Sequence, residues 1–426
     1  MPDLDWIKDV KKQSDIMPAK NIAIISTLDT KIESVSFLES IVKEFGHSPI
    51  LIDVGALTST GTRSDFSNDN VAQRGGQDRS ALVKSGKRDE IMTAMGKGAA
   101  HVLKELLDDR RLDGVIGIGG NQGTAIAAMA MRSMPIGLPK SLVSTVASGN
   151  MRPYVGHKDI NVVFSVADLV GRPNAVSRAI LRNAMCALIG MVEHGATVKR
   201  DEGKKTIALS ALGNTEPAAH RISELLTEKG FEVITFHASG AGGSAMEELI
   251  EAGVFSGIID LTPHELSEEV NGKGAYVPVV PGRMQAAARA GIPQVVSTGA
   301  LEYLCFGPWE SIPVSMRKRK IYMHNPFNAN VKVTQKEMPE IGRIMAKRLN
   351  ESKGPVTILV PLRGWSTYGS KGGLFYDLKG YELLLTSLKK GLRSEIEYKE
   401  VDLHINDQQF ADMCVDSLLL KMDGLG

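Results

Sequence analysis

The sequence predicts an α/β protein with two Rossmann-like doubly wound domains, each built around a mainly parallel sheet. Short apolar segments alternate with helical segments along most of the chain, which is the pattern of parallel sheets. At 426 residues the chain is also longer than one hydrophobic core usually serves. A polar, charged stretch at 196–205 separates two such series, so we predict domains at 1–195 and 206–426 joined by this linker.

Three stretches of the first half resemble three stretches of the second half, in the same order. In each of the three pairs, a predicted strand and its adjacent turn in the first half align with a strand and turn in the second half. The pairs are 22–31 with 207–216, 113–120 with 256–263, and 137–145 with 291–298. The shared order favours an internal duplication of one α/β unit.

In the first half, continuous apolar runs predict strands, and apolar residues at helical spacing predict helices. The predicted strands are 22–26, 49–54, 115–118, 141–146 and 160–166, and the predicted helices are 31–45, 89–107, 124–131 and 174–192. Residues 55–85 form a long polar segment, which we interpret as a loop and a candidate lid over a ligand.

The second half repeats the alternation of strands and helices. The predicted strands are 206–211, 231–236, 257–261, 294–297 and 356–360, and the predicted helices are 217–229, 244–252, 283–290 and 335–349. Further elements close the chain up to Leu420.

A glycine-rich turn after the third strand is the most informative motif. Gly119, Gly120 and Gly123 follow the apolar run, and good helix formers begin at Thr124. Free N–H groups at a helix N-terminus bind phosphate, and glycine lets the backbone approach the anion closely. A tight turn that needs glycine only for packing is the alternative.

Ligands of open α/β sheets bind outside the carboxyl ends of the strands, so the residues there are candidates for binding a nucleotide. The glycine turn would hold phosphates, Asp29 a magnesium ion, Lys31 developing negative charge, and Asp53 a ribose. For Asp29 and Thr30, capping of the helix predicted from Lys31 is the alternative. The candidate cofactor-binding residues are Thr27, Asp29, Thr30, Lys31, Asp53, Gly119, Gly120, Asn121, Gln122, Gly123, Thr124, Thr145, Ser148 and Gly149.

Two common nucleotide motifs do not fit this turn. An ordinary P-loop, GxxxxGK[ST], needs a lysine that does not follow here. The dinucleotide motif GxGxxG fails because Gln122 stands in place of its third glycine. NAD is therefore disfavoured, and with it a dehydrogenase.

The chain resembles the UPF0261 family of Tm-1-like ATP-binding proteins in STLDTK at 26–31, GVIGIGGNQGT at 114–124 and IGLPKSLVSTVASG at 136–149. The resemblance continues in VVSTGALEYLCFGP at 295–308 and KIYMHNP at 320–326. It implies two Rossmann-like domains, ATP with magnesium (Mg²⁺) in the first domain, and self-association as a homodimer or higher homo-oligomer. Family phosphate turns can read GGSGGT, whereas this one reads GGNQGT.

The second half lacks the glycine turn and has titratable residues in its place. His264 and Glu265 form a candidate acid/base pair, and Arg283 is a candidate partner for an anionic substrate. Each also has a structural alternative, such as a helix cap or an internal ion pair. Together with other polar residues near strand ends of this half, they define a candidate catalytic site for a small molecule. These other residues are His237, Ser297, Gly299, Glu302, His324, Asn325 and the glycine-rich stretch 363–373.

The net charge and the cysteine content limit the kinds of partner and site that we expect. The formal net charge of +1 provides no field that would attract nucleic acid or a membrane surface. Cys186, Cys305 and Cys414 lack CxxC spacing, so we expect buried free thiols rather than a metal or disulfide site. We see neither a signal peptide nor an apolar span of about 20 residues, and expect a cytoplasmic protein.

These observations predict a Mg-ATP-binding protein that acts as an ATP-dependent enzyme on a small anionic metabolite. A non-catalytic regulatory or partner-binding protein, in which the nucleotide sets a conformation or an oligomeric state, is the alternative.

Overall fold

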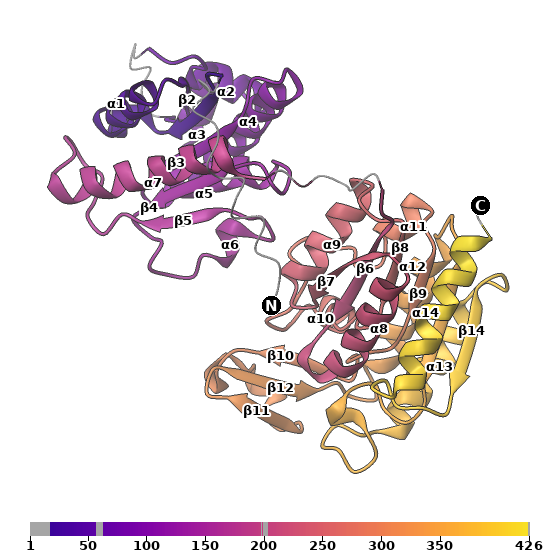
Figure 1. The fold of residues 1–426 in the computed structure, drawn as a ribbon. Helices are drawn as coiled ribbons and strands as arrows, with labels where there is room; N and C mark the ends of the chain where they lie inside the picture. Colours follow the sequence, from indigo (N-terminus) through magenta and orange to yellow (C-terminus); the bar gives the residue numbers. More distant parts are fainter. Residues whose placement is uncertain (1–17, 57–62, 197, 199–202, 425–426) are drawn as a thin grey trace. The chain divides into compact units, whose positions relative to one another are not determined.

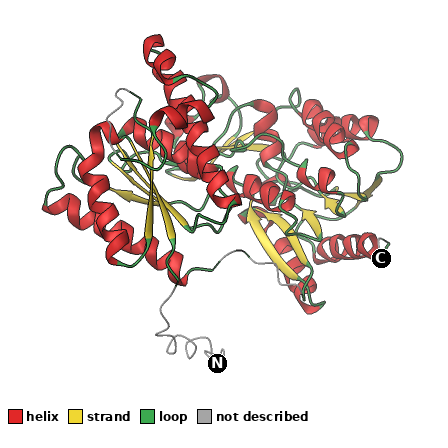
Figure 2. Cartoon of the chain, turned by 90° about the horizontal axis from the view of Figure 1, so that it is seen from above, coloured by secondary structure: helices red, strands yellow, loops and turns green. Residues whose placement is uncertain are grey.

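The computed structural model describes residues 18–56, 63–196, 198 and 203–424. The chain divides into two compact units, Met1–Val198 and Lys199–Gly426, each with its own parallel sheet (Figure 1). Helices flank these sheets, as the view from above also shows (Figure 2). The fold is the α/β architecture with two parallel sheets that the sequence predicts.

The first unit contains a five-stranded sheet in the order β2-β1-β3-β4-β5, and all its neighbouring strands are parallel. The strands are β1 (Asn21–Ser26), β2 (Ser48–Asp53), β3 (Gly114–Gly119), β4 (Lys140–Ser144) and β5 (Asn161–Phe164). The helices are α1 (Leu28–Glu44), α2 (Asn68–Arg74), α3 (Arg79–Ser85), α4 (Arg88–Asp108), α5 (Asn121–Arg132), α6 (Arg152–Val155) and α7 (Ala175–His194).

The inner strand β1 shows why this sheet is apolar on both faces. Ile22 and Ile24 pack in a cluster with residues of α1 and α7, whereas Ala23 and Ile25 pack in a second cluster with α4 and α5. Successive side chains of a strand point to opposite faces, so a strand covered by helices on both sides must be apolar throughout. This is the pattern that made the strands predictable.

The second unit contains a six-stranded parallel sheet in the order β7-β6-β8-β9-β13-β14 and an antiparallel sheet in the order β10-β12-β11. The strands are β6 (Thr206–Ala211), β7 (Glu232–His237), β8 (Gly257–Asp260), β9 (Gln294–Val296), β10 (Tyr303–Phe306), β11 (Ile321–Asn325), β12 (Asn328–Lys332), β13 (Val356–Pro361) and β14 (Glu397–Val401). The α-helices are α8 (Glu216–Glu228), α9 (Ala241–Glu251), α10 (Glu265–Asn271), α11 (Ala286–Ala290), α12 (Met338–Asn350), α13 (Leu378–Gly391) and α14 (Gln408–Asp423).

The two parallel sheets share one topology. Five strands of each follow the order 2-1-3-4-5, so β6, β7, β8, β9 and β13 correspond in place to β1 to β5. The three pairs of similar stretches fall on β1 with β6, β3 with β8, and β4 with β9. Each pair thus occupies the same position in its sheet, which supports an internal duplication.

The structure corrects the prediction of a long loop at 55–85. Helices α2 and α3 cover much of this segment and bury Val71, Ala72 and Leu82 in the core of the first unit. A Cβ atom added to Gly98 of α4 would lie 1.8 Å from the carbonyl oxygen of Val71, so α2 and α4 touch backbone to backbone. This tight packing does not favour a lid made of α2 or α3, and 57–62 lie outside the described residues.

Other elements were missed or misplaced. The antiparallel sheet β10-β12-β11 and helix α10 were not predicted, and the helix expected at 283–290 is limited to Ala286–Ala290. Helix α1 begins at Leu28 and α5 at Asn121, each three residues earlier than expected.

One described helix, α7, is long and apolar enough to cross a membrane by length and composition alone. The expectation that no segment has these properties is therefore wrong. Leu181, Leu188 and Ile189 of α7 are buried in the core of the first unit, and 33% of the apolar window of this helix is buried.

We predict opposite effects for alanine at two helical glycines of the first unit. Gly98→Ala should lower the free energy of unfolding by about 1–3 kcal/mol, because its methyl group would overlap the backbone of Val71. The matched control is Gly190→Ala in α7, where a Cβ meets nothing within 4 Å. It should raise that free energy by up to about 1 kcal/mol. Urea unfolding measures both, and equal effects would mean that α2 does not pack as described.

Candidate functional site

The first unit has a cavity of about 620 Å³ at the carboxyl ends of its strands. The strand order reverses between β1 and β3, and in open α/β sheets such a switch point is where ligands bind. The residues of the wall follow β1, β2 and β3 or come from α4 and the segment before α7. They are Thr27, Asp29, Thr30, Lys31, Val54, Ala56, Arg88, Ile91, Met92, Gly120, Asn121, Gln122, Gly123, Ile126 and Val170.

The glycine turn places the N-terminus of α5 in this cavity. A Cβ on Gly119 would lie 2.7 Å from backbone atoms of Gly123 and Thr124, so only glycine fits the sharp connection. Gly120 is the N-cap residue of α5, and because glycine has no side chain, no side-chain group caps this helix. Amide N–H groups of the first helical turn have no acceptor within the helix, so those at Asn121 to Gly123 are available to an anion.

Two basic side chains, those of Lys31 and Arg88, line the same cavity. The Nζ atom of Lys31 is 4.0 Å from the nearest carboxylate oxygen of Asp168, which is a loose ion pair with an exposed partner. Arg88 is exposed and forms the first residue of α4. A cation is unfavourable at a helix N-terminus unless an anion compensates the dipole. Both side chains therefore suit a negatively charged ligand.

Asp29 contributes a carboxylate to the same wall. It lies in the first turn of α1, and its Oδ1 atom is buried without a hydrogen-bond partner among the described residues. A Cβ on Gly55 would lie 2.9 Å from this carboxylate, so the glycine makes room for it. Because α1 begins at Leu28 after the N-cap Thr27, capping by Asp29, or by Thr30, is not the explanation. A buried carboxylate oxygen without a donor is a suitable ligand for a divalent cation.

Other predicted residues of the first unit have structural roles. Asp53 is buried and accepts hydrogen bonds from the backbone N–H groups of Leu28 (3.1 Å) and Gly55 (2.9 Å). Burial raises the pKa of Asp53 and these two bonds oppose the rise. Asp53 thus fixes the start of α1 and does not line the cavity, which corrects the ribose assignment. Thr124 is also buried, with its Oγ1 2.7 Å from Oγ of Ser144.

The three residues predicted after β4 do not line the cavity. These are Thr145, Ser148 and Gly149. Thr145 is nevertheless adjacent to the turn, because its Oγ1 would lie 3.7 Å from a Cβ on Gly120.

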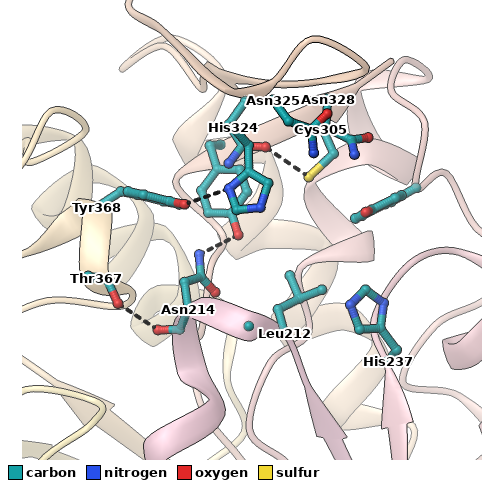
Figure 3. Close-up of a pocket in the computed structure, with 13 residues that line it drawn as sticks. Leu212, Asn214, His237, Cys305, His324, Asn325, Asn328, Thr367 and Tyr368 are labelled. Carbon is teal, nitrogen blue, oxygen red and sulfur yellow. Dashed lines mark hydrogen bonds between the residues drawn. The ribbon is translucent and has the colours of Figure 1, made fainter. Parts of the chain in front are cut away.

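The second unit has a cavity of about 410 Å³ at the corresponding ends of β6 and β7, with further walls from the antiparallel sheet (Figure 3). Its lining is polar and aromatic, and among the described lining residues there is no lysine, arginine or carboxylate. The residues are Leu212, Gly213, Asn214, His237, Tyr276, Tyr303, Cys305, His324, Asn325, Asn328, Asn330, Thr367 and Tyr368.

Hydrogen bonds connect several of these side chains across the cavity. Nδ2 of Asn214 donates to the hydroxyl of Tyr303 at 2.5 Å, and the hydroxyl of Tyr368 is 3.5 Å from Nδ1 of His324. Burial lowers the pKa of His237, so its imidazole favours the neutral form. Donors and acceptors without a net charge suit a neutral polar ligand.

The predicted acid/base pair is not formed, and neither residue lines this cavity. His264 and Glu265 are both fully buried. His264 Nε2 is 3.2 Å from Oε1 of Glu268, one turn along α10, rather than from Glu265. The Glu265 carboxylate instead accepts hydrogen bonds from the backbone N–H groups of Gly240 (2.5 Å) and Gly243 (3.0 Å) at the start of α9.

Arg283 is the centre of an internal ion network rather than a partner for a substrate. Its guanidinium donates to Glu265 at 2.5 Å, to Asp260 at 2.9 Å and to Glu247 at 2.9 Å. The Arg283 side chain is only 1% exposed. Although burial acts in the opposite direction, the three carboxylates raise its pKa well above the ordinary value. The structural alternative for Arg283 is therefore the one observed.

Two doubly wound units, each with a cavity at the carboxyl ends of its strands, define a two-domain Rossmann-like α/β protein. Residues 20–197 match the N-terminal domain, and residues 204–422 the C-terminal domain, of the uncharacterised protein family UPF0261. The chain belongs to this family.

Curated relatives agree with this assignment. The chain is 38% identical to a UPF0261 protein of Clostridium tetani, over 95% of this chain and 99% of that protein. A UPF0261 protein of Rhizobium meliloti is 37% identical over 93% of this chain and 98% of its own length. The ToMV resistance protein Tm-1 of Solanum lycopersicum is 33% identical over 93% of this chain, but the match spans only 55% of the tomato protein.

We predict that removing the charge of Arg283 lowers the stability of the folded protein. Arg283→Met should lower the free energy of unfolding by about 3–5 kcal/mol, because it leaves three buried carboxylates without their cation. The matched control is Arg289→Met on α11, which breaks only an exposed pair with Glu251 and should cost less than about 1 kcal/mol. Denaturant unfolding measures both variants. A small effect at Arg283 would contradict the role we assign to the network.

Proposed function

We propose that the chain binds Mg-ATP in the cavity of the first unit. The observation that carries this proposal is the uncapped N-terminus of α5, which opens into a cavity at the β1–β3 switch point. Backbone amides of a helix N-terminus, reached through glycines, are a general phosphate site. The size of the cavity, about 620 Å³, lies in the range of small-molecule sites.

The other residues that line the cavity suit the phosphate charge, the magnesium ion and the base of a nucleoside triphosphate. Lys31 and Arg88 would compensate the phosphate charge, and the free oxygen of Asp29 would hold magnesium directly or through water. Ile91, Met92 and Val170 give the cavity an apolar portion against which a base could pack. The resemblance of 114–124 to the Tm-1-like phosphate turn supports ATP as the nucleotide.

We further propose an ATP-dependent reaction as the use of this site, with a regulatory role as the alternative. An anionic substrate would have to bind beside Lys31 and Arg88 in the first cavity, because the described lining of the second cavity contains no lysine or arginine. The first cavity can therefore account for a small anionic metabolite, whereas the second favours a neutral polar one.

Our first functional prediction concerns Gly120. Wild-type protein should bind ATP with magnesium in calorimetric titration, and Gly120→Asp should weaken binding by about 100-fold or more. The new carboxylate would stand where phosphate is expected, and like-charge contact costs several kcal/mol. The control, Gly120→Ala, should bind within a few fold of wild type, because a Cβ here meets only Thr145 Oγ1 at 3.7 Å. Equal affinity of wild type and Gly120→Asp would place the nucleotide elsewhere, and no binding by wild type would refute the proposal.

A second prediction separates the metal from the phosphates. Asp29→Asn should reduce the gain in ATP affinity on adding magnesium, while affinity without magnesium stays equal or rises because a negative charge is lost. Asp168→Asn is the control, since this carboxylate is 70% exposed and outside the cavity lining. The measurement is the ratio of ATP dissociation constants with and without magnesium. An unchanged ratio in Asp29→Asn would remove Asp29 as the metal ligand.

Turnover distinguishes the enzyme from the regulator. An enzyme should release ADP from Mg-ATP when supplied with a small-molecule extract, and Gly120→Asp should abolish that release. ATP binding without turnover under any extract fraction would favour the regulatory alternative.

A further inference from the structure

A buried cluster of three potential metal ligands lies beside the cavity of the second unit. It comprises Nε2 of His264, a carboxylate oxygen of Glu268 and Sγ of Cys305, and these atoms all lie within 4.8 Å of one another. His264 and Glu268 are fully buried, and Cys305 is 7% exposed and lines the cavity (Figure 3). His264 is the N-cap of α10, Glu268 lies on α10 and Cys305 lies on β10. The sequence predicts neither element.

His264 is oriented as a metal-binding histidine is. Its Nδ1 atom lies 2.7 Å from the carbonyl oxygen of Ala300, so it carries the proton and donates. That bond leaves Nε2 directed toward Oε1 of Glu268 at 3.2 Å, the geometry of an ion pair, so a metal ion would have to displace the proton between them. Histidine ligands of metals generally donate their second N–H to a carbonyl or carboxylate in this way.

Glu268 is held in place by the backbone. The N–H of Cys305 donates to its Oε1 at 2.5 Å, and the N–H of Tyr276 donates to its Oε2 at 2.6 Å. A Cβ on Gly274 would lie 1.9 Å from Oε2, so a glycine is needed for the chain to pass this carboxylate. Such outer contacts fix a ligand before the metal arrives.

Cys305 connects the cluster to the cavity. Its Sγ lies 3.4 Å from the side-chain oxygen of Asn330, which also lines the cavity. Oxygen and nitrogen of an amide are assigned from hydrogen bonds, and the flipped Asn330 would donate Nδ2–H to a thiolate. The same contact therefore suits a metal-bound sulfur.

We propose that His264, Glu268 and Cys305 bind a zinc ion, with the remaining coordination position directed to the cavity of the second unit. Nitrogen, oxygen and sulfur ligands together are typical of zinc, and three protein ligands leave a position for water or a ligand. At a tetrahedral zinc ion such ligand atoms lie roughly 3.3–3.8 Å apart, so the 3.2 Å His264–Glu268 separation already fits. Sγ of Cys305 lies within 4.8 Å of the other two ligand atoms and would have to move closer to them when the metal binds.

The charges also balance. A thiolate, a carboxylate and a neutral imidazole together carry two negative charges, which Zn²⁺ neutralises among side chains that are largely buried. Binding displaces the thiol proton of Cys305 and any proton on Nε2 of His264, and both leave to solvent. This site is independent of the nucleotide proposal, because all three ligands belong to the second unit.

The test uses the full-length wild-type protein. It is first treated with a chelator and then titrated with Co²⁺, which takes the place of zinc and reports a sulfur ligand by a thiolate-to-cobalt charge-transfer absorption band. We expect one equivalent of Co²⁺ per chain, the appearance of this band, and its loss when Zn²⁺ is added. The absence of the band in wild-type protein would overturn the proposal, whether or not ATP binds.

Variants then locate the site. Cys305→Ser should abolish the charge-transfer band, and Glu268→Gln should weaken Co²⁺ binding by about tenfold or more while keeping the size of the side chain. Cys186→Ser is the matched control, since this half-buried cysteine lies on α7 of the first unit and should leave the band unchanged. Loss of the band in Cys186→Ser but not in Cys305→Ser would refute the assignment.

A measurement on wild-type protein tests ligation by Cys305 even if the Cys305→Ser variant does not fold. Alkylation of Cys305 in chelator-treated wild type, followed by mass spectrometry, should slow when Zn²⁺ is present because the thiolate is then bound to the metal. An unchanged alkylation rate at saturating Zn²⁺ would contradict ligation by Cys305.

Discussion

The parallel pairing of β1 with both β2 and β3 is the constraint on which the site of the first unit depends. Because all strands run the same way, their carboxyl ends meet at one edge, and the reversal of strand order leaves a cavity there. The residues just after β1 and β3 must then face each other, although about 90 residues separate them in sequence. Asp29 and Gly120 share one cavity wall for this reason alone.

This logic explains what the sequence could and could not predict. Strands buried on both faces and the glycine turn have local signals, so β1, β3 and the N-terminus of α5 were predictable to within a few residues. The role of Asp53 has no local signal, because the amide of Leu28 that it binds follows the neighbouring strand β1, 25 residues earlier in the sequence. The partners of Arg283 are likewise distant in sequence, and only folding brings Asp260, Glu265 and Glu247 around it.

The antiparallel sheet was missed for a related reason. Strand β12, NANVK, has neither a continuous apolar run nor a regular alternation, and Pro308 and Pro313 interrupt the approach to β11. Yet this sheet supplies Cys305, His324 and Asn330 to the second cavity. Sequence patterns therefore locate the scaffold of the second site but not most of the side chains that line it.

The duplicated scaffold also explains why the two cavities differ in chemistry. At the place of Gly119–Thr124 the second unit has Thr262, Pro263, His264 and Glu265, and proline has no N–H group to offer an anion. Glu265 directs its carboxylate to the amides at the start of α9, so an internal anion already satisfies that helix N-terminus. The described N-terminus of α9 is therefore not free to bind an anionic ligand. In the second cavity the antiparallel sheet instead provides neutral amide side chains, one imidazole, one phenol and one thiol.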